Sequence, residues 1–112
     1  MELRSPDGAC NPYFVFALLI AAGLEGIEKE LKLPKPTELN LMDASVDTTG
    51  LQSLPKTLGE AVEAARRSEF LKEVLPTDVI EKFLVAKQRE WEEVNGSPDS
   101  HEAENQLYFG QI

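Results

Sequence analysis

Residues 11–31, NPYFVFALLIAAGLEGIEKEL, decide the fold class of this chain. Asn11 can cap a first helical turn and Pro12 is favoured at the first helical position, so the segment predicts a long helix. The first half of this helix is apolar on every side, whereas its second half narrows to one apolar stripe. A helix that is apolar all round must be covered all round. We expect a chain of 112 residues to supply only part of that cover.

Downstream, residues 32–56 predict an irregular connection. Pro34 and Pro36 end the preceding helix, and Gly50 and Pro55 interrupt the remainder of the segment. A connection of this length without periodic structure is unusual inside a compact domain, so it indicates a segment that lies across another surface.

Residues 57–94 predict further helices, each with its own start signal. Thr57 and Glu60 match a capping box, Ser68 can cap a short turn, and Asp78 can cap the most regular helix of the chain. The apolar stripes of the first and last of these helices are formed by Leu58, Val62 and Ala65, and by Ile80, Phe83, Leu84, Lys87, Trp91 and Val94. Residues 95–112 predict a polar tail.

Residues 1–10 predict the end of a strand followed by a turn. Glu2 and Arg4 fall on one face of an extended segment, because strand side chains repeat every two residues. A carboxylate and a guanidinium so placed can hold a divalent cation and a substrate carboxylate or phosphate. Taken alone, two charges at a chain end are more typical of a solvated terminus. The predicted fold is therefore mainly α, one partial domain over residues 1–112 with a short N-terminal strand remnant.

Charge and composition exclude several classes of partner. A net charge of −9 disfavours binding to nucleic acid or to an anionic membrane surface. The apolar run at residues 13–24 is too short to cross a bilayer, and the acidic residues before it do not resemble a secretory leader. We therefore expect a cytoplasmic protein. Cys10, the single cysteine, is expected to be a small buried thiol.

Residues 2–12 carry the pattern E-x-R-x-P-D-x-x-x-N-P, and residues 2–31 as a whole resemble glutamine synthetases of the bacterial and archaeal class. The likeness continues at Asn40-Leu41, at residues 54–61, at residues 83–92 and at His101, Glu104 and Tyr108. The resemblance implies the helical C-terminal part of the glutamine synthetase catalytic domain.

That family condenses glutamate and ammonia with ATP and two divalent cations, Mg or Mn, through a γ-glutamyl phosphate. The resemblance implies that Glu2 is a metal ligand and that Arg4 is a catalytic residue, which contacts the substrate glutamate or the transferring phosphate. Pro6, Asp7 and Asn11 would be structural, forming a turn and a helix cap.

The chain also departs from the family pattern. Met42 stands where many bacterial members have a tyrosine that is adenylylated, so that regulation is not expected in this chain. The other metal ligands and the nucleotide-binding residues of the family precede this motif. We therefore expect the isolated chain to bind no cofactor and to make no glutamine. The family further implies a homo-oligomer of two stacked hexameric rings, in which the tail from His101 contacts another subunit.

Two alternatives stay open. The chain can be a stand-alone, non-catalytic helical interaction module of the same descent, which would pair through Phe14, Phe16 and Leu19. It can also be a secreted or lipid-anchored protein that uses Cys10, although the acidic residues at its start argue against this.

Overall fold

All regular secondary structure among the described residues is α-helical. The computed structural model describes residues 3–41, 43, 45, 47 and 50–109. Its helices are α1 (Pro12–Glu28), α2 (Leu58–Arg67), α3 (Glu69–Val74), α4 (Thr77–Gly96) and α5 (Ser100–Tyr108). No strand occurs among these described residues, which confirms the mainly α prediction. None of the described helices has the length and apolar character needed to cross a membrane.

The predicted strand remnant at the N-terminus is not observed. Leu3 and Arg4 have no regular secondary structure, and Glu2 lies outside the described residues. A strand needs a neighbouring strand to pair its backbone N–H and C=O groups. No described residue lies in a strand, so among these residues the segment has no strand to pair with.

Side-chain caps begin the helices where the sequence predicts them. Asn11 Oδ1 accepts the backbone N–H of Tyr13 at 3.0 Å. Thr57 Oγ1 accepts the N–H of Glu60 at 3.1 Å, and the Glu60 carboxylate accepts the N–H of Lys56 at 2.7 Å. These bonds satisfy donors that a helix leaves without partners at its first turn. The first turns of α1 and α2 are thus encoded locally.

One predicted cap is wrong. Ser68 caps α3 as expected, accepting the N–H of Leu71 at 3.2 Å. Asp78, in contrast, lies inside the first turn of α4, which begins one residue earlier and follows Pro76 without a side-chain cap. The Asp78 carboxylate still favours the helix start, because negative charge is stabilised at a helix N-terminus.

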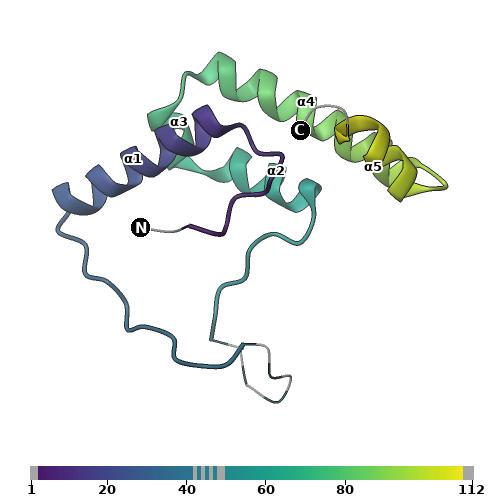
Figure 1. The fold of residues 1–112 in the computed structure, drawn as a ribbon. Helices are drawn as coiled ribbons and strands as arrows, with labels where there is room; N and C mark the ends of the chain where they lie inside the picture. Colours follow the sequence, from purple (N-terminus) through teal and green to yellow (C-terminus); the bar gives the residue numbers. More distant parts are fainter. Residues whose placement is uncertain (1–2, 42, 44, 46, 48–49, 110–112) are drawn as a thin grey trace.

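The first helix ends earlier than predicted, at Glu28 and not near Leu31. Glu30 adopts a left-handed conformation with a φ of 48°, and the N–H of Leu31 bonds to the carbonyl of Gly26 at 3.0 Å. This arrangement is a Schellman-type ending, which closes the last turn and redirects the chain. Beyond it, residues 32–56 contain no described helix or strand, and Figure 1 shows this connection looping away from the helices.

The predicted polar tail contains a helix that was not predicted from the sequence. Asp99 caps α5, with its carboxylate accepting the N–H of Glu102 at 3.0 Å. The sequence does contain a start signal for this helix. An acidic or hydroxyl residue followed three positions later by Glu, here Asp99 and Glu102, is a helix-start pattern.

The core lies between α2 and α4. Val62, Ile80 and Leu84 are its buried residues, and the partly buried side chains packed against them are those of Leu58, Ala65, Leu71, Leu75 and Phe83. The inner faces predicted for α2 and α4 are therefore confirmed. A core of three buried residues is small for a chain of this length.

The first helix is largely uncovered by the described chain. α1 contains no buried residue, and its exposed large apolar side chains form one stripe at helical spacing: Tyr13, Phe16, Ile20, Leu24 and Ile27. Their exposed fractions run from 54% at Leu24 to 83% at Tyr13. Figure 1 shows α1 at the edge of the helical group, beside α3. An apolar stripe of this extent marks an interaction surface.

A cluster of rings and charges joins α1, α4 and α5, and we call it the Lys87 cluster. The rings of Phe14 and Phe83 meet edge to face, with centroids 5.1 Å apart. Lys87 Nζ lies 5.7 Å from the Phe83 ring centroid and 5.3 Å from that of Tyr108. The same ammonium lies 2.7 Å from a carboxylate oxygen of Glu90, to which the Tyr108 hydroxyl donates a hydrogen bond. The cation thus joins α4 to α5, and Phe14 of α1 meets the cluster at the ring of Phe83.

α2 approaches α4 closely at Gly59. A Cβ atom built there would lie 2.6 Å from Nε1 and 2.8 Å from Cε2 of Trp91. By contrast, a Cβ built at Gly23 of α1 would meet nothing within 4 Å. The indole therefore packs directly on the backbone at Gly59.

We predict that Gly59→Ala lowers the free energy of unfolding by about 1 kcal/mol, because the cost of overpacking exceeds the helix-propensity gain. Gly23→Ala, the matched control, should raise it by roughly 0.5–1 kcal/mol. Denaturant unfolding followed by the fluorescence of Trp91, the single tryptophan, measures both. Equal stabilisation by the two variants would contradict the close approach.

A second prediction concerns self-association through the exposed stripe of α1. Phe16→Glu should weaken self-association of the isolated chain about ten- to hundredfold, since burial of a phenylalanine contributes roughly 1.5–3 kcal/mol. Val85→Glu, at an exposed apolar residue of α4, serves as the control and should have little effect. Sedimentation at several concentrations tests this, and a wild-type chain that stays monomeric throughout would refute it.

A third prediction concerns pH. Burial, and then the bond to Glu90, raise the pKa of Tyr108 above its ordinary value. Above about pH 10 a phenol in the unfolded chain loses its proton while the folded one keeps it, so stability must fall as pH rises. Tyr108→Phe should remove this loss. Unfolding measured from about pH 8 to about pH 11 in both proteins tests it, and parallel curves would show that Tyr108 does not contribute.

Candidate active-site segment

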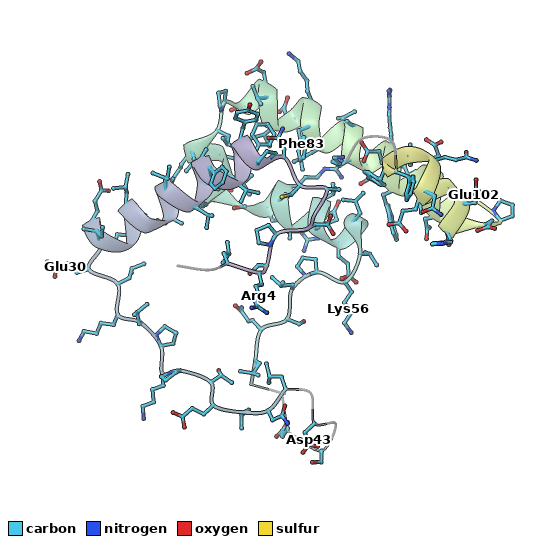
Figure 2. The ribbon with its side chains drawn as sticks, in the orientation of Figure 1. Arg4, Glu30, Asp43, Lys56, Phe83 and Glu102 are labelled. Atoms are coloured by element: carbon cyan, nitrogen blue, oxygen red, sulfur yellow. The ribbon has the colours of Figure 1, made fainter. Side chains whose placement is uncertain are left out.

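Of the two predicted site residues, Arg4 lies among the described residues and Glu2 does not. Arg4 is exposed on the extended segment before α1, and Figure 2 shows its side chain pointing away from the helices. Glu2, the predicted metal ligand, lies outside the described residues, as does Met42. The described structure therefore places Arg4, and the pairing of Glu2 with Arg4 stays a prediction.

A tight turn connects Arg4 to the first helix. The Asp7 carboxylate accepts the N–H of Ala9 at 2.8 Å, and the Asp7 carbonyl accepts the N–H of Cys10 at 3.1 Å. Asn11 then caps α1. These bonds confirm the predicted turn and cap, and they tie the direction of the Arg4 segment to the start of α1.

The same turn lies within electrostatic reach of α5. Burial is the largest cause of the raised pKa of Tyr108, followed by the Glu90 carboxylate, with smaller contributions from the charges of Glu104 and Asp7. Of the family-like tail residues, Tyr108 joins the Lys87 cluster, whereas His101 is exposed.

Within the described residues, no three histidine, cysteine or acidic side chains gather where they could hold a metal ion. A cation usually needs several oxygen ligands, so one bound at Glu2 would require carboxylates from beyond the described part of this chain. The described residues therefore do not by themselves form a metal centre.

An open groove between α2 and α4 was not foreseen from the sequence. Its volume is about 560 Å³, and its lining includes Gly59, Glu63, Arg67 and Trp91. The Glu63 carboxylate lies 3.0 Å from Arg66 and 3.3 Å from Arg67, so its charge is compensated. The spacing of Gly59 and Trp91 gave no sequence signal, because the two residues meet only through helix packing.

Comparisons with known proteins agree with the resemblance. The family profile described as "Glutamine synthetase, catalytic domain" matches residues 1–106. Glutamine synthetase of Methanosarcina mazei is 45% identical over 96 residues, covering 83% of this chain and 22% of that protein. Glutamine synthetase of Mycolicibacterium smegmatis is 40% identical over 110 residues, covering 96% of this chain and 25% of that protein.

Glutamine synthetase of Thermotoga maritima is 34% identical over 112 residues, covering 97% of this chain and 26% of that protein. This chain thus spans about a quarter of the length of these relatives. No solved structure matches it. The chain belongs to the glutamine synthetase family and corresponds to a helical segment of its catalytic domain.

Proposed function

We propose that this chain is the C-terminal segment of an ATP-dependent glutamate–ammonia ligase. The observation that carries this proposal is the family match over residues 1–106, which includes the Glu2 and Arg4 positions. The expected substrates of the complete protein are glutamate, ammonia and ATP, and its expected cofactor is Mg or Mn.

Two residues of this chain would serve that reaction. Arg4 would contact the substrate glutamate or the transferring phosphate, since a guanidinium presents a planar fork of donors to such groups. Its exposure and the hydrogen-bonded turn that follows it in the chain suit this role. Glu2 would contribute one carboxylate to a divalent cation, which offsets charge during phosphoryl transfer.

We further propose that the isolated chain does not synthesise glutamine. A single carboxylate cannot hold two cations, and this segment spans only about a quarter of its relatives. The uncovered stripe of α1 supports the same conclusion, because it would be covered by the remainder of the catalytic domain.

The expected assembly is a homo-oligomer of stacked rings, in the cytoplasm, with no nucleic acid or membrane partner. The charge of −9 is consistent with this, since it opposes binding to polyanions. Contacts between subunits would then account for exposed apolar residues that the rest of the catalytic domain leaves uncovered.

One observation favours a second candidate function. The exposed stripe from Tyr13 to Ile27 would also serve a stand-alone helical module, which pairs with itself or with a partner and catalyses nothing. The two candidates differ in the size of the native polypeptide.

An antibody against this segment should detect a native polypeptide several times heavier than 12.4 kDa. That polypeptide, immunopurified, should form glutamine from glutamate, ammonia and ATP, whereas the 112-residue chain should form none. A native band at 12.4 kDa would instead favour the stand-alone module and would remove the proposed roles of Glu2 and Arg4.

A further inference from the structure

The first turn of α1 is fixed at both of its ends. On one side Asn11, which directly follows the Asp7 turn, accepts the N–H of Phe14 through Oδ1 at 3.3 Å. On the other side the ring of Phe14 meets that of Phe83 on α4 at 86°, an attractive edge-to-face geometry. The position of Phe14 therefore sets the position of the turn that precedes it.

The ring of Phe83 is in turn held by Lys87, one helical turn further along α4. The ammonium lies over both Phe83 and Tyr108, and cation–π attraction is strongest where water is partly excluded. The side chain of Lys87 is only 23% exposed and that of Glu90 25%. Both charges are thus partly desolvated, which strengthens their attraction.

We propose that Lys87 is a positioning residue for Arg4. It acts through Phe83 and Phe14, which place the Asp7 turn and thereby set the direction in which Arg4 is presented. This inference rests on the proposed role of Arg4 in the glutamate–ammonia ligase. Lys87 itself touches no reacting group.

The α5 helix contributes the second aromatic ring of the Lys87 cluster. Tyr108 covers the Lys87 ammonium with a second ring and bonds to Glu90, so docking of α5 shields the cation from water. The start of α1 and the end of α5 thus meet α4 at the same cluster.

A double-mutant cycle in the complete synthetase tests the proposal. Lys87→Met keeps the apolar stem and removes the cation, and it should lower kcat/KM for glutamate about three- to tenfold. Arg4→Lys should lower it roughly ten- to hundredfold. If Lys87 acts through Arg4, the double variant should be little worse than Arg4→Lys alone.

Two controls separate positioning from general stability. Lys87→Arg keeps the cation and should restore most of the lost activity. Lys82→Met alters an exposed lysine of the same helix, which pairs with Asp78 at 3.5 Å, and it should leave the kinetics unchanged. If Lys87→Met does not fold, Tyr108→Phe takes its place in the cycle, with an expected loss of about two- to threefold.

The outcomes are distinguishable. Losses that multiply in the double variant would overturn the positioning role while leaving the function of Arg4 intact. Unchanged kinetics for Arg4→Lys would overturn the proposed role of Arg4, and the positioning role with it, while leaving the proposed ligase activity of the complete protein intact. A double variant close to Arg4→Lys alone, with rescue by Lys87→Arg, supports both.

Discussion

The Lys87 ammonium between the rings of Phe83 and Tyr108 joins the end of α5 to α4, at the place where Phe14 of α1 also meets α4. The apolar core alone is small, because only Val62, Ile80 and Leu84 are buried among the described residues. That core lies between α2 and α4, and Phe83 at its edge meets Phe14 at the start of α1. The start of α1 and the end of α5 both meet α4 at the Lys87 cluster. There, contacts between a partly desolvated charge and aromatic rings add to the packing of apolar side chains.

Local signals made much of this architecture predictable. Asn11, Thr57 and Ser68 each cap the helix that the sequence assigned to them, because a side-chain cap needs only residues two or three positions away. The apolar residues on the inner faces of α2 and α4 were likewise predictable from their spacing in the sequence. The pattern around Arg4 was specific enough to indicate the family on its own, whereas the helical parts alone would not have done so.

Other features could not be predicted, because they arise from contacts between distant residues. Tyr108 reaches Glu90 across 18 positions, and Phe14 reaches Phe83 across most of the chain. Glu30 ends α1 early in a left-handed conformation. A glycine usually occupies such a position and signals the helix end in the sequence, whereas here the residue is a glutamate. The strand expected at Arg4 failed for a related reason, since extended backbone becomes a strand only beside another strand.

The long connection between α1 and α2 bears on the order of folding. α2 to α5 are joined by short links, and they can pack together at little cost in loop closure. α1 must close a loop of residues 29–57 before Phe14 can reach Phe83. We therefore expect α1 to dock last and to detach first. The segment that bears Arg4 would then gain its final shape only after the rest of the chain has formed.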